Sequence, residues 1–297
     1  MAALLSQVWA MDAGALDRVV AVLARHAAGV VLDPSQIDAA IAEPKAAAAE
    51  RHNTVAPGSV AVIPVWGVVA HRARMVQSVS GPSGTSSEIV MRQFRAALAD
   101  PNVAAILLDV DSPGGSVMGT PELADAILHA RGQKPIVAHA NALMSSAAYW
   151  IASAADEIVA SPSAMVGSIG VLAVHADTSA ADAAAGIKYS IVHYGRHKAE
   201  GASVAPLSDE ARATLQEQVD HYGAVMTASI AKGRGVGVDV VRGEQYGEGR
   251  AFVAREAMSR GMVDRIEPLD ATLDRLQNAR KRSHVGRNAN ALRLASA

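Results

Sequence analysis

Short apolar runs alternate with helix-like segments through the middle of the chain. Runs rich in Val, Ile and Leu occupy residues 60–66, 103–110, 135–139 and 157–160. The intervening segments carry helix signals, including Ser87 as a cap and Pro121 in a first turn. Strands that alternate with helices of about ten residues are typical of parallel βαβ units. The sequence therefore predicts an α/β fold around a buried parallel sheet.

The remainder of the chain divides into a long helical segment and two ends of different character. A helix capped by Ser208 is expected to run to about Lys232, followed by a strand, a helix and a strand within residues 244–266. We expect three regions: an N-terminal accessory helical segment at 1–56, a main domain at 57–279 and a basic flexible tail at 280–297.

Composition excludes several classes of protein. The 297 residues include no cysteine, which rules out disulfides, thiol catalysis and cysteine-ligated metal. The net charge of −2 gives no basic field for nucleic acid. The histidines lack metal-ligand spacing, so we expect neither a metal nor a cofactor. Charged residues interrupt the apolar stretch 1–32, so we expect no membrane anchor and a cytoplasmic location.

Ser146 and Lys198 are the candidate reactive residues. Ser146 lies where a loop turns into a small-residue helix within 142–156. Lys198 follows the apolar run 189–193, which predicts a strand. A serine hydroxyl becomes a strong nucleophile only when a base removes its proton, and a desolvated lysine can be that base. The pair therefore indicates a Ser-Lys hydrolytic site.

Two further segments fit around that pair. Asp111-Ser-Pro-Gly-Gly115 follows a predicted strand, and glycines at such a turn can aim backbone N–H groups into a cleft as an oxyanion hole. Val166-Gly-Ser-Ile-Gly170 supplies Ser168, a hydroxyl able to hold the lysine amine. Tyr149 and Trp150 are expected to pack rather than react, and Asp109 and Asp111 to brace the glycine turn.

These segments, in this order and spacing, resemble the signal peptide peptidase A family of Ser-Lys peptidases. The similarity covers roughly residues 60–269, and the stretches 195–201 and 206–216 resemble the branch of phage and prophage head-maturation proteases of the minor capsid protein C type. The resemblance implies a ClpP/crotonase-like fold of repeated ββα units. It assigns Ser146 as nucleophile, Lys198 as base, Gly114 with Gly115 beside it as oxyanion hole, and Ser168 as the residue that orients Lys198.

The same resemblance sets the functional expectation. We expect a serine endopeptidase that matures phage heads by cleaving capsid or scaffold protein. It would act in the cytoplasm or inside a capsid precursor, as a homo-oligomer with a site that subunits could share. The alternative within the family is a cytoplasmic signal-peptide-peptidase-like enzyme that degrades peptides.

Four other interpretations stay open at this level. Ser145 could be the nucleophile instead of its neighbour Ser146. A Ser-His-Asp triad could use the histidines near the lysine segment or beyond Ser168; the candidates are His175, with Asp177 close by, His193 and His197. A crotonase-like acyl-CoA enzyme would share the fold but would not need Lys198. A catalytically dead capsid component would not need Ser146.

Overall fold

The computed structural model describes residues 8–12, 14–16, 58–71 and 84–278. Two sheets form its framework, and the larger has seven strands. Those strands are β2 (Ser59–Trp66), β5 (Val103–Ser112), β7 (Ile136–Ser145), β8 (Glu157–Ala160), β9 (Met165–Gly167), β11 (Ala251–Val253) and β12 (Arg265–Ile266). The pairs β2–β5, β5–β7, β7–β8 and β7–β9 are parallel, which confirms the α/β prediction.

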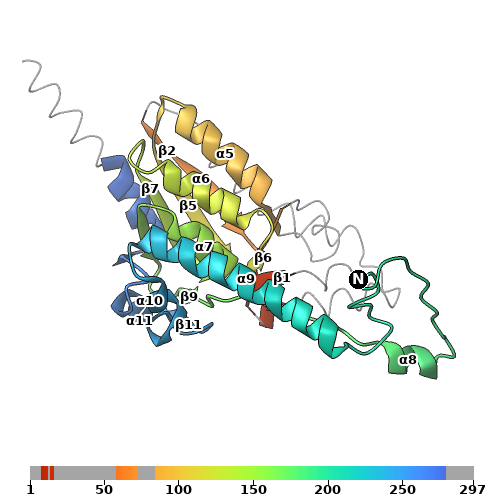
Figure 1. Cartoon of the computed structure of the whole chain (residues 1–297). Helices are drawn as coiled ribbons and strands as arrows, with labels where there is room; N and C mark the ends of the chain where they lie inside the picture. The colour runs from red at the N-terminus through yellow and green to blue at the C-terminus, as the bar shows by residue number, and fades with distance from the viewer. Residues whose placement is uncertain (1–7, 13, 17–57, 72–83, 279–297) are drawn as a thin grey trace, which may run out of the picture.

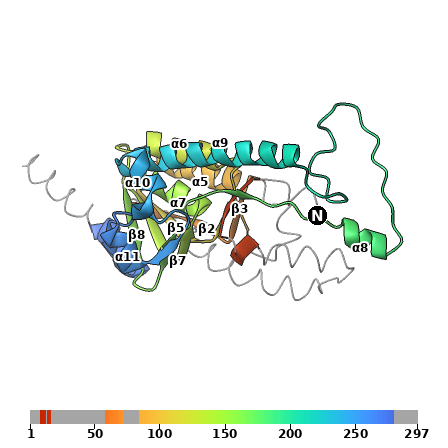
Figure 2. The same ribbon diagram turned by 60° about the horizontal axis from the view of Figure 1, so that its bottom comes forward.

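Helices cover one face of this sheet. They are α5 (Ser87–Ala99), α6 (Thr120–His129), α7 (Ala147–Ser153) and the long α9 (Asp209–Arg234), which packs against α6 and α7 and extends beyond them (Figures 1 and 2). The helix starts follow the sequence signals. Ser208 caps α9 by accepting a hydrogen bond from the Ala211 N–H, and Pro121 lies in the first turn of α6. The α5 cap is Ser86, one residue before the expected Ser87.

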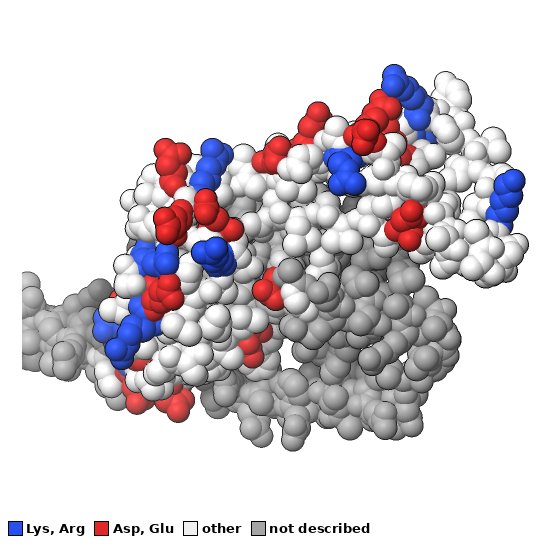
Figure 3. All heavy atoms as spheres, turned by 90° about the horizontal axis from the view of Figure 1, so that it is seen from below, with Lys and Arg blue, Asp and Glu red and all other residues white. Residues whose placement is uncertain are grey.

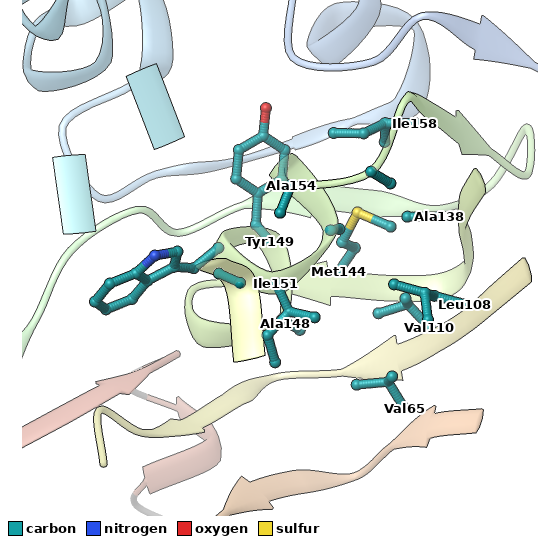
Figure 4. Packing of buried hydrophobic residues seen from close by; sticks show 14 of the residues in the cluster. Val65, Leu108, Val110, Ala138, Met144, Ala148, Tyr149, Ile151, Ala154 and Ile158 are labelled. Atoms are coloured by element: carbon teal, nitrogen blue, oxygen red, sulfur yellow. The ribbon is translucent and has the colours of Figure 1, made fainter. Parts of the chain in front are cut away.

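The two faces of the sheet explain why its strands read as continuous apolar runs. In β5, Ile106, Leu108 and Val110 point into the core beneath the helices, whereas Leu107 belongs to a second cluster with Leu276 on the opposite face. A strand buried on both faces has no polar alternation. Figure 4 shows the first of these cores, which contains Tyr149 and Ile151 of α7 together with Leu108 and Val110 of β5.

The smaller sheet has five strands in the order β10-β1-β6-β3-β4. They are β10 (Leu172–Ala173), β1 (Val8–Met11), β6 (Gly114–Ser116), β3 (Val68–Ala70) and β4 (Gly84–Ser86). The helix expected across the N-terminal segment is therefore wrong at Val8–Met11, where the chain is a buried strand. Backbone pairing on both edges overrides the local helical pattern there.

The C-terminal part of the described chain completes the fold. It contains α10 (Val238–Arg242), the 3-10 turn η1 (Glu244–Tyr246) and α11 (Ala254–Ser259), and the short α8 (Ser179–Ala184) precedes α9. The strand expected to begin near 244 is confined to β11, after η1. None of the described helices is long and apolar enough to cross a membrane. Most of the accessory segment 1–56 and all of the basic tail lie outside the described residues.

Candidate active site

Ser146 occupies the corner between β7 and α7. It is fully buried, and its backbone has φ 54° and ψ −116°, outside the regions that non-glycine residues normally adopt. Two backbone hydrogen bonds fix this corner: the Ser146 N–H donates to Gly167 O at 2.8 Å, and Ser146 O accepts from the Trp150 N–H at 2.9 Å. Strained backbone of this kind persists only where the surroundings determine it, and it concentrates at functional sites.

Tight packing holds the helix that begins at this corner. Tyr149 and Trp150 are fully buried, as the sequence predicted, and Tyr149 donates its phenolic hydrogen to Met262 O at 2.9 Å. Burial raises the pKa of Tyr149 well above its usual value, so this hydroxyl stays a neutral donor. At the other end of α7, the Arg131 guanidinium donates to the carbonyls of Ser153 and Ala154 and to that of Gly233 in α9.

The predicted oxyanion-hole glycines lie beside Ser146. A Cβ atom added to Gly114, whose φ is +99°, would stand 3.0 Å from Ser146 Cβ and 2.3 Å from Ala10 O. A Cβ on Gly115 would stand 1.8 Å from Val69 O. Only glycine allows the backbone to pass this close to the serine and to β3. The Gly114 N–H donates to Ser112 Oγ at 3.2 Å, and Gly115 pairs with Ala10 of β1, so both glycines have partners from the chain itself.

Ser168 belongs to the segment 167–170, which also contacts Ser146. It follows Gly167, whose carbonyl binds the Ser146 N–H, and its own N–H donates to Arg250 O at 2.8 Å. Ser168 is 9% exposed and also has a positive φ, 52°. The carbonyl of Gly170 accepts a hydrogen bond from the Ser146 hydroxyl at 3.1 Å. The structure therefore brings together Ser146, the first two residues of β6 (Gly114 and Gly115) and the 167–170 segment.

Lys198 does not join this group within one chain. It lies in an exposed turn, where its N–H donates to Gly195 O, and no described hydrogen bond links it to Ser146. The stretch 189–193 is not the strand that its apolar sequence predicted; it is an exposed segment with no regular structure. We call residues 187–201 the arm. Together with α8 it projects beyond the end of the body in Figures 1 and 2.

The alternative reactive residues lie elsewhere or are enclosed. His175 contacts Ala205 O, and His193 contacts Gly195 O. Among the described histidines none forms a hydrogen bond to Ser146, so this part of the chain assembles no Ser-His-Asp triad. Ser145 lies within β7 and is 1% exposed, and its hydroxyl has no hydrogen-bond partner among the described residues. The corner geometry therefore favours Ser146 over Ser145.

One group of described side chains has the arrangement of a metal site. His197, Glu200 and Glu210 approach one another at the base of the arm, but their groups pair with protein: His197 contacts Glu200, and Arg196 donates to Glu210 at 2.8 Å. The Arg196–Glu210 contact is an ion pair of an exposed surface. Acidic and basic side chains also intermix on the face shown in Figure 3.

Comparison with known proteins identifies a family and several relatives of this sequence. The sequence model described as Peptidase family S49 matches residues 129–283. The chain is 33% identical over 232 residues to the capsid assembly protease C of Escherichia phage lambda, covering 74% of this chain and 52% of that protein. It is 32% identical over 207 residues to the head-tail preconnector protein GP5 of Enterobacteria phage P21, covering 70% and 40%. The chain thus spans about half or less of the length of these curated relatives.

Further relatives and solved structures extend the comparison. Protease 4 of Salmonella typhi is 29% identical over 223 residues, covering 72% of this chain and 33% of that protein. A mutant of the 1510-N membrane-bound stomatin-specific protease aligns with a TM-score of 0.46 at 16% identity, covering 74% and 84%. A ClpP1 mutant from Listeria monocytogenes aligns at 0.45 and 13%, covering 71% and 94%. The family match includes both Ser146 and Lys198, and it confirms the resemblance seen in the motifs: the chain belongs to peptidase family S49.

Proposed function

We propose that this chain is a serine endopeptidase in which Ser146 is the nucleophile and Lys198 the general base. The observation that carries the proposal is the buried, strained corner at Ser146, which the 114–115 backbone and the 167–170 segment both approach. Nucleophiles of acyl transfer require this kind of fixed geometry beside backbone donors. Membership of peptidase family S49 supports the same chemistry.

The reaction follows from these positions. The Lys198 amine, in its neutral form, accepts the proton of the Ser146 hydroxyl as Oγ attacks the peptide carbonyl. Backbone N–H groups of Gly114 and Gly115 stabilise the oxyanion once their present partners have moved aside. The amine then gives its proton to the leaving nitrogen, and an acyl-enzyme forms on Ser146. Water, deprotonated by the same amine, hydrolyses the ester and restores both groups.

The lysine in this mechanism comes from a neighbouring copy of the chain. A lysine amine acts as a base only when burial favours its neutral form, and Lys198 is exposed in the single chain. The arm that carries it also exposes apolar side chains: Val192 is 96% exposed, and Tyr189 and Tyr194 are also open to solvent. Exposed apolar side chains gathered on one segment mark an interaction surface. Docking of the arm against a second copy would bury these side chains and deliver Lys198 to that copy's Ser146.

Mixing two inactive variants tests the shared site. Ser146→Ala and Lys198→Ala are each expected to be inactive on an unfolded protein such as casein. When co-expressed, they can form mixed oligomers in which the Lys198→Ala copy supplies Ser146 and the Ser146→Ala copy supplies the lysine. We expect activity to return in the mixture. A mixture that stays inactive, although mass spectrometry shows mixed oligomers, would place both residues in one chain.

A matched pair of variants tests the docking surface. Val192→Ser and Tyr194→Ser remove apolar area from the arm without touching the core, so they should weaken self-association while leaving the melting temperature of the dissociated chain unchanged. Ile89→Ser is the control, because Ile89 is 43% exposed on α5, away from the arm. Analytical ultracentrifugation measures the difference. Equal association of all three proteins would contradict the role of the arm.

We further propose that the substrate is a capsid or scaffold protein of a phage head. The relatives from phages lambda and P21 support this assignment through their names. The test is to co-express the chain with phage capsid and scaffold proteins and to map new protein termini by mass spectrometry. Termini that appear with the unmodified chain and disappear with Ser146→Ala support the proposal. Cleavage of membrane-bound signal peptides, with no cleavage of head proteins, would refute it.

A further inference from the structure

The N-terminal strand β1 fills a gap one strand wide between β6 and β10. It is antiparallel to both neighbours: Trp9 is opposite Ser116 of β6 and Leu172 of β10, and Met11 is opposite Gly114. The two sides of the gap are far from β1 in sequence, so no hairpin turn keeps the strand in place. Both backbone edges of β1 are therefore used by segments that the fold positions independently of it.

This gap runs along the reactive serine. Gly114 lies between β1 and the serine: a Cβ atom added to it would contact both Ala10 O of β1 and Ser146 Cβ. On the other side, the Ser146 hydroxyl donates to Gly170, two residues before β10 begins. Asp12 continues the pairing, because its N–H donates to Pro113 O at 2.9 Å. Ala10 thus lies beside Ser146 within the extended backbone of β1, and the pairing with the 113–116 segment continues to Asp12.

An extended peptide that reached Ser146 from this side would need the position that β1 holds. Peptides commonly bind by adding a strand to an open sheet edge, where main-chain hydrogen bonds supply the affinity. Here both available edges, those of β6 and β10, are already paired with β1. The present arrangement is consequently closed to a substrate in the gap.

The side chains of β1 are buried, but not all of them are satisfied. Val8 and Ala10 belong to the main core, whereas Trp9 and Met11 pack with Leu16, Val68 and Leu172 on the other face. The indole N–H of Trp9 is buried without a hydrogen-bond partner among the described residues. A buried unpaired donor costs roughly 1–3 kcal/mol, which lowers the free energy needed to withdraw the strand.

We propose that β1 is a tethered inhibitor that occupies the peptide-binding gap in the resting chain. Withdrawal of β1 opens β6 and β10 to an extended substrate segment. The alternation seen in β1 gives the chemistry of that segment: small or β-branched residues at the positions of Val8 and Ala10, and larger apolar residues at those of Trp9 and Met11. The proposal rests on the endopeptidase function proposed above.

A reversible crosslink tests whether β1 must move. Trp9 and Leu172 are directly opposed, and the chain contains no cysteine, so the double variant Trp9→Cys/Leu172→Cys can form one disulfide. We expect the oxidised protein to hydrolyse casein about tenfold more slowly or worse than the same protein after reduction, because the crosslink removes the open population. Each single-cysteine variant serves as control and should show the same rate before and after reduction.

A binding measurement tests the inhibitory role of β1 separately from the proposed endopeptidase function. The crosslinking pair is placed in the Ser146→Ala background, and a fluorescent peptide with the sequence of residues 8–12 is titrated by anisotropy, with a scrambled peptide as control. Binding of the native-order peptide to the reduced form but not to the oxidised form supports the proposal. Equal binding to both forms, or equal hydrolysis by both, shows that β1 is a fixed part of the sheet. Redox-dependent peptide binding, together with no casein hydrolysis by the reduced crosslinking variant that retains Ser146, would instead refute the endopeptidase function.

Discussion

The corner that carries Ser146 and the arm that carries Lys198 differ in almost every physical respect. Ser146 is fully buried, and hydrogen bonds to Gly167 and Trp150 fix its backbone. Lys198 is exposed, and the apolar side chains before it have little to pack against. The hydrogen bonds and packing that fix the corner all come from one chain. The arm, by contrast, is rich in apolar side chains that remain exposed in that chain. The difference supports the proposal that each copy supplies the nucleophile and that assembly supplies the base.

The largest expected effect separates the two adjacent serines at the corner. Ser146→Ala should reduce turnover by about four orders of magnitude or more, because the nucleophile is lost. Ser145→Ala is the matched control and should retain activity, since it removes only a buried hydroxyl with no described partner. It should also leave stability unchanged or raise it slightly. Hydrolysis of casein and thermal unfolding measure both effects, and the reverse pattern would make Ser145 the nucleophile.

The second prediction is that variants of Lys198 in the arm lose activity without losing stability. Lys198→Ala and Lys198→Arg should each lose most activity, because arginine stays protonated and cannot act as a base. Neither should change the melting temperature by more than about a degree, since an exposed side chain away from special features contributes within roughly 0.5 kcal/mol. Near-normal turnover by Lys198→Ala would remove this residue from the mechanism.

The third prediction concerns a buried group in the body, His139 of β7. Its ring lies between the hydroxyls of Thr272 and Ser161, and desolvation by burial lowers its pKa to about 4, with Arg275 adding to this and Glu267 opposing it. An unfolded histidine titrates near 6.5, so the unfolded state binds more protons between these values. The contribution to stability is present above about pH 6.5 and is lost as pH falls toward 4, by about 3 kcal/mol at most.

Urea unfolding at several pH values tests this difference. His139→Gln should flatten the dependence between about pH 6.5 and 4, whereas His193→Gln, an exposed arm variant, should leave it as steep as in the unmodified chain. An unchanged slope in His139→Gln would show that other groups cause the acid sensitivity.

The smallest of the four effects concerns the contact of α9 with α7. A Cβ on Gly233 would stand 2.3 Å from Ser153 O, so Gly233→Ala should force the two helices apart and destabilise the chain by about 2 kcal/mol, despite the better helix propensity of alanine. Gly237→Ala is the control, because its added methyl group meets nothing within 4 Å and its φ is −68°. Equal unfolding midpoints for the two variants would contradict the close packing.

The body of the fold was predictable because its signals are local. The apolar runs correspond to β2, β5, β7 and β8, and the capping serine of α9 and the proline of α6 mark helix starts as expected. The small-residue stretch after Ser146 indicated a helix, and it is α7. These features depend on residues close in sequence, whose period and turn chemistry act before distant contacts form.

Two segments show where local signals were insufficient. Val8–Met11 lies in a stretch with a helical pattern, yet it is a strand because β6 and β10 offer paired edges on both sides. Residues 189–193 are a run of the kind that forms buried strands, yet no strand of the described part of the chain pairs with them, and they stay exposed. In both cases the outcome depends on whether a distant segment supplies hydrogen-bond partners and apolar cover.

The sequence by itself determined the α/β class, the order of the main elements and the segments that carry Ser146, Ser168 and the two glycines. The tertiary structure alone decided the strained backbone at Ser146, the strand that fills the gap beside it and the separation of Lys198 from it. The physical reason is that residue type and spacing encode which chemistry a segment can perform. Only long-range backbone pairing and burial fix which of those segments meet within one chain.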